Sequence, residues 1–135
     1  MARRAHGGKD YLPEAIPTLR AAVYEPTMSK DVLFKLAATI KERRNARPED
    51  SHTRRLLDDG PLKPAKKLGE EAVEVALAAL VQDDKALIGE AADMLYHFLV
   101  LLESRTVALD DVFAELERRM EATALNQEKR KTASR

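Results

Sequence analysis

Residues 66–102 read KKLGEEAVEVALAALVQDDKALIGEAADMLYHFLVLL, two long apolar segments that are each interrupted by a pair of acids. Glu71 and Glu74 lie three residues apart in the first segment, and Glu90 and Asp93 lie three apart in the second. Residues at this spacing project from the same face of an α-helix. The sequence therefore predicts two helices, each with a cluster of carboxylate oxygens on one side.

The second of these helices is expected to be buried. From Ala86 to Leu102 its only formal charges are Glu90 and Asp93, and a helix that is apolar nearly all round belongs in a core. Buried carboxylates are costly unless something compensates their charge. A hard divalent cation does so, and a set of oxygen ligands suits Mg²⁺ or Mn²⁺ better than Zn²⁺.

A solvated helix face is the competing interpretation of the first acid cluster. Glu70, Glu71 and Glu74 could simply point into water, as charged runs on helices often do. The same interpretation is weaker for Glu90 and Asp93, because the residues around them leave little polar surface to share.

The rest of the chain predicts an all-α fold, an antiparallel bundle of about four main helices without strands. Ser29 is expected to cap the first helix, and Asp83 or Asp84 and then Asp110 the last two. The expected helices cover residues 30–44, 64–81, 85–104 and 111–123, with a short helical turn at 54–57 in a polar loop. The short turn at residues 82–84 makes the middle two an antiparallel hairpin, which brings the two acid pairs face to face.

Apolar spacing predicts which sides of the outer helices are buried. The expected stripes are Val32, Leu33, Leu36, Ala37 and Ile40 in the first helix, and Val112, Phe113, Leu116 and Met120 in the last. The expected division is an irregular arm (1–28, with a short helical turn near 15–23), a helical domain (29–123) and a basic flexible tail (124–135).

Composition limits the possible functions. The 135 residues suffice for one domain, and the net charge of +0 gives no global attraction to nucleic acid or to a membrane surface. There is no cysteine, which excludes disulfides and thiolate metal sites and agrees with a cytoplasmic protein. No transmembrane span or signal peptide is expected.

Basic residues precede the first acid cluster. Lys63, Lys66 and Lys67 lie at the start of the second long helix, and Arg54 and Arg55 lie in the loop before it. Helix amides together with cationic side chains favour phosphate, so these residues could hold a polyphosphate beside a metal ion, although surface lysines are more often only solvated.

His97 follows Asp93 by four residues and shares its helix face. It could orient a carboxylate or contact a substrate, or it could be a buried histidine that bonds to a neighbour on its own helix. Tyr96 lies beside this stripe and is expected in the core or in an interface.

The pattern E-x-x-E, a spacer, then E-x-x-D resembles the MazG-like all-α nucleoside triphosphate pyrophosphohydrolases. Further segments resemble the phosphoribosyl-ATP pyrophosphohydrolase family of histidine biosynthesis over about residues 30–120. They are SHT (51–53), KKLGEEAVEV (66–75), EAADMLYHFLVLL (90–102) and LDDVFAELERR (109–119).

The resemblance implies a magnesium-dependent, nucleotide-binding dimeric enzyme that cleaves phosphoribosyl-ATP into phosphoribosyl-AMP and pyrophosphate. It implies metal ligands at Glu71, Glu74, Glu90 and Asp93, with Glu70 as a further ligand or as an activator of water beside Glu71 and Glu74. It also implies phosphate contacts from Lys67 and Lys66, and a substrate site lined by Ser51 and Thr53; His97 is a further candidate substrate contact.

The chain departs from the family pattern in places. His52 replaces a usual tyrosine, Thr106 stands near a usual glycine, and Pro61 and Pro64 are unusual before the lysines. A house-cleaning pyrophosphatase for another nucleoside triphosphate therefore stays open, as does a non-catalytic helical dimerisation module. For a dimer, the extra apolar surface is expected near the end of the 85–104 helix, at Phe98, Leu101 and Leu102.

Overall fold

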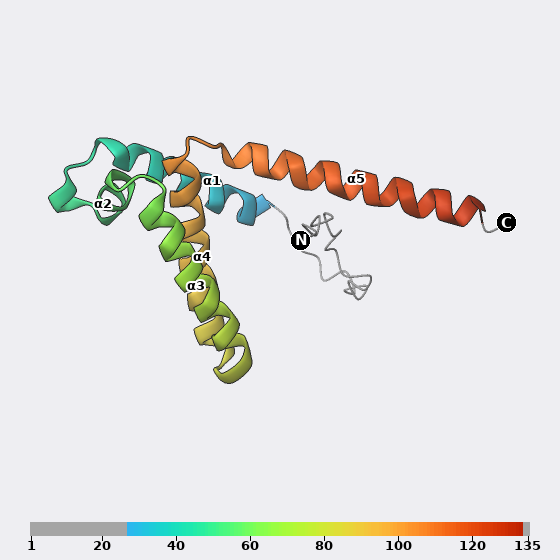
Figure 1. The fold of residues 1–135 in the computed structure, drawn as a ribbon, viewed down its shortest axis with the longest axis horizontal. Helices are drawn as coiled ribbons and strands as arrows, with labels where there is room; N and C mark the ends of the chain where they lie inside the picture. The colour runs from blue at the N-terminus through green and yellow to red at the C-terminus, as the bar shows by residue number, and fades with distance from the viewer. Residues whose placement is uncertain (1–26, 134–135) are drawn as a thin grey trace, which may run out of the picture.

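The computed structural model describes residues 27–133, which form helices joined by short connections (Figure 1). No strand occurs in this range, which confirms the all-α prediction. The α-helices are α1 (Thr27–Glu42), α2 (His52–Asp58), α3 (Leu62–Val81), α4 (Asp84–Ser104) and α5 (Leu109–Ala133), and two 3₁₀ turns, η1 (Arg43–Asn45) and η2 (Pro48–Asp50), join α1 to α2. The helical turn predicted near residues 15–23 lies outside the described residues.

Helices α3 and α4 form the predicted antiparallel hairpin (Figure 1). Asp83 caps α4, since its Oδ1 accepts a hydrogen bond from the backbone N–H of Ala86 at 2.8 Å. Helix α3 begins at Leu62, slightly earlier than predicted, and Pro64 sits buried in its first turn. A proline is tolerated there because the N–H that it lacks has no intrahelical partner in any case.

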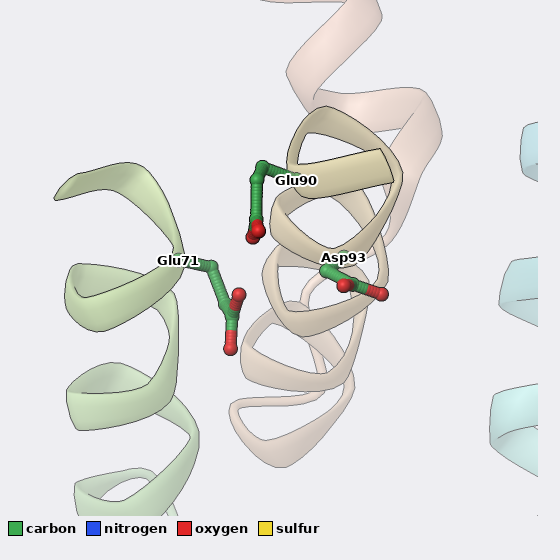
Figure 2. A group of neighbouring side chains, drawn as sticks. All are labelled: Glu71, Glu90 and Asp93. Carbon is green, nitrogen blue, oxygen red and sulfur yellow. The ribbon is translucent and has the colours of Figure 1, made fainter. Parts of the chain in front are cut away.

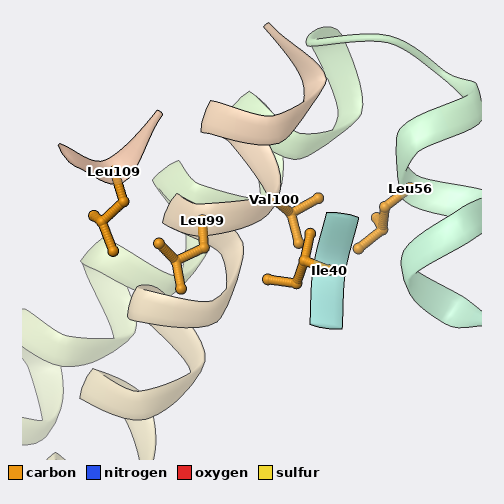
Figure 3. Packing of buried hydrophobic residues seen from close by; sticks show 5 residues of the cluster. All are labelled: Ile40, Leu56, Leu99, Val100 and Leu109. Carbon is orange, nitrogen blue, oxygen red and sulfur yellow. The ribbon is translucent and has the colours of Figure 1, made fainter. Parts of the chain in front are cut away.

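The apolar core lies at one end of this hairpin, where α1, α2 and the start of α5 meet the C-terminal half of α4. Its buried residues are Ile40, Leu56, Leu99, Val100 and Leu109 (Figure 3). Phe34 of α1 packs edge-on against Phe113 of α5, with ring centroids 5.5 Å apart. The core therefore fixes α1, α2 and α5 around the end of α4 that is remote from Glu90 and Asp93.

Several predicted boundaries and faces near the N-terminal side were wrong. Helix α1 begins at Thr27, so Ser29 lies within it rather than at its cap. Val32 is exposed, whereas the later members of its predicted stripe do pack against the core. Helix α2 begins at His52 and is longer than the single turn predicted at 54–57.

Helix α5 extends well beyond its predicted end at Thr123 and points away from the other helices (Figure 1). It begins at Leu109, so Asp110 lies in its first turn rather than at its cap. Phe113 packs against the core, but Leu116 and Met120 are exposed, contrary to the predicted stripe. The reason is geometric, because only the first turns of α5 reach the other helices.

The other end of the α3–α4 hairpin is apolar but uncovered. Leu80 of α3 is 80% exposed and Ile88 of α4 is 69% exposed, so the prediction that α4 is buried on nearly every side was wrong for the single chain. Phe98 and Leu102, where extra surface was expected, instead pack against the core. An apolar pattern predicts that a helix face is buried, but it does not identify the neighbour that covers that face.

Among residues 27–133, no helix is both long enough and apolar enough to cross a membrane.

Candidate metal and nucleotide site

Three carboxylates from the two arms of the hairpin come together. Glu71 reaches from α3 toward α4, and Glu90 and Asp93 lie on neighbouring turns of α4 (Figure 2). One oxygen from each lies within 4.8 Å of the others. The antiparallel pairing predicted from the sequence thus does bring acids of both clusters together, and we call Glu71, Glu90 and Asp93 the acid group.

Glu74 and Glu70 are not members of the acid group, although Glu74 lies close enough to act on it. Burial is the largest cause that raises the pKa of Glu90, and the negative charges of Glu74, Glu71 and Asp93 raise it further. The negative charges of these acids therefore act on one another. The prediction that Glu90 and Asp93 are buried was wrong, because Glu90 is half-buried and Asp93 is exposed in a hairpin whose apolar end is uncovered.

His97 is the buried polar residue next to the acid group. It is 7% exposed, and its Nε2 lies 3.9 Å from Oε1 of Glu71. Its Nδ1 is buried and has no hydrogen-bond partner in the described part of the chain. Burial lowers the pKa of His97 despite the opposing effect of Glu71, with Lys67 and His52 contributing in the same direction as burial. A neutral imidazole leaves the charge of Glu71 unbalanced at neutral pH.

The predicted phosphate-binding lysines lie beside Glu70. Lys67 Nζ is 3.2 Å from one carboxylate oxygen of Glu70, and Lys66 Nζ is 3.9 Å from the other. All three side chains are at least partly exposed on α3. Lys67 also influences the pKa of His97, which places it near the acid group. Lys67 therefore lies between Glu70 and the surroundings of His97, whereas Lys66, within residues 32–133, contacts Glu70 alone.

The two predicted residues of the polar loop belong to α2. Ser51 is buried, and its Oγ caps α2 by accepting a hydrogen bond from the N–H of Arg54 at 3.1 Å. The hydroxyl of Thr53 forms a hydrogen bond with the hydroxyl of Tyr96 on α4. Ser51 therefore sets the start of α2, and Thr53 ties that start to the helix that carries Glu90 and Asp93.

Two residues near the site were missed by the sequence analysis. Tyr96 was expected in a core or an interface and does pack against the core, but its hydrogen bond to Thr53 was not predicted, although Tyr96 follows Asp93 by three residues on α4. His52 was noted only as a departure from the family pattern. It precedes Thr53 and acts on the pKa of His97. No spacing rule in the sequence links α2 to α4. The sequence therefore could not indicate that His52 lies near His97.

The donors of the acid group fit a hard cation. They are all carboxylate oxygens, and the nearby His97 is not a member of the group, which matches the ligand chemistry of Mg²⁺ and Mn²⁺. Burial, and then the negative charges of the neighbouring acids, raise the pKa of Glu90, and a bound cation would oppose both effects.

The sequence matches the family described as phosphoribosyl-ATP pyrophosphohydrolase over residues 33–120. A phosphoribosyl-ATP pyrophosphatase from Ruegeria pomeroyi is 53% identical over 88 residues, which cover 65% of this chain and 84% of the relative. One from Methylobacterium nodulans is 49% identical over 98 residues, covering 73% and 92%. The histidine biosynthesis bifunctional protein HisIE from Xanthomonas axonopodis pv. citri is 48% identical over 94 residues, covering 70% and 46%.

The matched residues include α2, α3 and α4 in full, and with them the acid group, the lysines and His97. The family resemblance inferred from the sequence is therefore confirmed, and the chain belongs to the phosphoribosyl-ATP pyrophosphohydrolase family.

Proposed function

We infer that this chain is a phosphoribosyl-ATP diphosphatase of histidine biosynthesis. It hydrolyses phosphoribosyl-ATP to phosphoribosyl-AMP and pyrophosphate, the second step of that pathway. The observation that carries this inference is the family match over residues 33–120, which contains every acid of the site. The match favours this substrate over that of a house-cleaning pyrophosphatase, and it speaks against a non-catalytic dimerisation module.

Magnesium is the proposed cofactor, with manganese as a possible substitute. Glu71, Glu90 and Asp93 would hold it, because their oxygens already lie within 4.8 Å of one another. Glu74 is the fourth proposed ligand, supported by its charge effect on Glu90. A bound Mg²⁺ supplies positive charge that offsets the negative charge growing on the phosphate oxygens in the transition state.

The remaining proposed roles, phosphate binding and activation of water, belong to side chains of α3. Lys67 and Lys66 would bind oxygens of the triphosphate, for which they would exchange their contacts with Glu70. Glu70, once released, would orient the attacking water and accept its proton, beside Glu71 and Glu74, which would act as metal ligands. Water adds across the α–β phosphoanhydride bond, which breaks to leave the nucleoside monophosphate and pyrophosphate.

The proposed substrate site extends from the acid group toward α2. Thr53 and Ser51 would line it from the start of α2, and His97 would close it from α4. The support is spatial, because the Thr53–Tyr96 hydrogen bond joins α2 to α4 one residue away from His97. The phosphoribosyl and adenine parts of the substrate would lie on this side.

A cytoplasmic homodimer is the proposed assembly. The exposed apolar residues on both helices of the hairpin provide the support, since extensive exposed apolar surface on a small protein marks an interface. These residues are Val73, Leu77, Leu80, Val81, Ile88 and Leu95. In the proposed dimer, the interface would lie along the α3–α4 hairpin that also carries the acids.

The test of the function is substrate choice by the purified full chain. Pyrophosphate release is measured with Mg²⁺ for phosphoribosyl-ATP, ATP and dUTP at equal concentrations. We expect phosphoribosyl-ATP to be hydrolysed far faster than the other two. Equal or faster hydrolysis of ATP or dUTP would assign the chain to the house-cleaning function instead.

A further inference from the structure

Two hydroxyl groups far apart in the sequence are hydrogen-bonded at the edge of the site. The Thr53 hydroxyl lies on the first turn of α2, and the Tyr96 hydroxyl lies on α4. Both side chains are half-buried, so the bond is partly shielded from water. It joins residues 43 positions apart and is not part of any helix.

The neighbours of these two residues lie on the nucleotide side of the site. Tyr96 precedes His97, whose Nε2 is 3.9 Å from Glu71, and their rings contact edge-on with centroids 5.0 Å apart. Tyr96 also follows Asp93 by three residues. A side chain on this part of α4 that reaches α2 fixes the distance between α2 and the acid group.

The later turns of α2 are held by other contacts than the Thr53–Tyr96 bond. Leu56 is buried in the core, and the Arg54 guanidinium donates hydrogen bonds to the backbone carbonyls of Arg44 and Ala46. These contacts hold the later turns of α2 against η1 and in the core, where Leu56 lies with Ile40 of α1 and Val100 of α4. Only the Thr53–Tyr96 bond, among the side-chain hydrogen bonds of residues 32–133, links α2 to α4.

We propose that Tyr96 is a positioning residue for the substrate, which acts by holding the N-terminal turn of α2, with Thr53 and His52, against the acid-bearing face of α4. This inference rests on the proposed function and adds to it a residue outside the acid and lysine set. Tyr96 touches no reacting atom in this arrangement; it determines where the α2 contacts to the nucleotide lie.

The position of the bond determines which kinetic constant it affects. The acids come from α3 and α4, which pack together along the hairpin without help from α2. Loss of the Tyr96 hydroxyl therefore loosens the N-terminal turn of α2, while the rest of α2 stays in the core and the acid group stays in place. A contact that serves ground state and transition state alike changes KM and leaves kcat nearly unchanged.

The experiment compares Tyr96→Phe with the parent in steady-state hydrolysis of phosphoribosyl-ATP at saturating Mg²⁺. Phenylalanine keeps the ring and removes only the hydroxyl. A net hydrogen bond of ordinary strength corresponds to an increase in KM of about three- to tenfold, with kcat and the Mg²⁺ dependence retained. Ser104→Ala is the matched control, because Ser104 is a half-buried hydroxyl of α4 that bonds only within its own helix, to the Leu101 carbonyl.

A double-mutant cycle with Thr53→Val completes the test. If the two hydroxyls act as a pair, adding Tyr96→Phe to Thr53→Val raises KM no further, and the effects on thermal unfolding of the substrate-free protein are also non-additive. Unchanged KM in Tyr96→Phe, additive effects in the cycle, or a loss confined to kcat would each overturn the proposal. A parent that does not hydrolyse phosphoribosyl-ATP would refute the proposed function, whereas the unfolding cycle would still report on the bond itself.

Discussion

His97 Nε2 lies 3.9 Å from Oε1 of Glu71, while its Nδ1 is buried without a hydrogen-bond partner among the described residues. A buried polar atom left unpaired costs about 1–3 kcal/mol. His97→Leu removes that atom and keeps much of the volume. We expect the free energy of unfolding of the metal-free protein to stay the same or to rise, while turnover falls because Glu71 loses its neighbour. Chemical denaturation and pyrophosphate release are the two measurements. A loss of more than about 1 kcal/mol in stability would show that Nδ1 does make a hydrogen bond in solution.

Removal of one acid charge should lower the activity without lowering the stability of the metal-free protein. Asp93→Asn and Glu74→Gln change shape little but each remove a negative charge that raises the pKa of Glu90. We expect turnover to fall by about a hundredfold or more, because charge on the phosphate goes uncompensated. The thermal midpoint of the metal-free protein should stay the same or rise, and added Mg²⁺ should raise the midpoint of the parent but not of the variants. Asp111→Asn, an exposed acid on α5, is the control, and turnover near the parent rate in either site variant would refute the metal assignment.

Thr106 offers a stabilising substitution at the end of α4. Its φ is 57°, in the left-handed region, and its N–H and that of Val107 bond back to the carbonyls of Glu103 and Leu102. This is a Schellman helix end, whose left-handed position favours glycine. Thr106→Gly should raise the free energy of unfolding by about 1 kcal/mol, because a β-branched residue is strained there.

Arg105→Gly is the matched control for Thr106→Gly. Arg105 has an ordinary φ of −102°, so its replacement by glycine should only lower the stability. No gain in the Thr106 variant, measured by thermal unfolding, would contradict the expected strain.

The uncovered end of the hairpin predicts the oligomeric state. We expect a dimer rather than a monomer of 15.1 kDa in sedimentation at micromolar concentration, with an interface of roughly 1,600 Å² or more in total. Ile88→Glu places a charge in that face and should shift the equilibrium toward monomer. Gln82→Glu adds the same charge in the turn between α3 and α4 and should leave the dimer intact. A monomeric parent would refute the assembly and leave the apolar face unexplained.

The sequence predicted the parts of the structure that depend on neighbours in the chain. The hairpin, its cap at Asp83 and the meeting of Glu71 with Glu90 and Asp93 all follow from helical spacing and a short turn. The helical class and the family assignment followed from the same segments.

The features that were missed depend on contacts between distant segments. The exposure of Leu80 and Ile88 could not be predicted, since an apolar pattern does not say whether the covering surface belongs to the same chain. The Thr53–Tyr96 bond joins α2 to α4, and no spacing rule connects them. The extension of α5 past Thr123 carries no strong apolar signal, because the added turns touch little of the remaining molecule.

The acid group is built from two helices that are adjacent in the chain and separated only by Gln82 and Asp83. Contacts between such neighbours need little loop-closure entropy, whereas the core must unite α1, α2, α4 and α5 across most of the described chain. During folding, the hairpin should therefore form ahead of the core, and the repelling carboxylates are brought together at that early step. A divalent cation present at that moment would act on the kinetics of folding as well as on the finished enzyme.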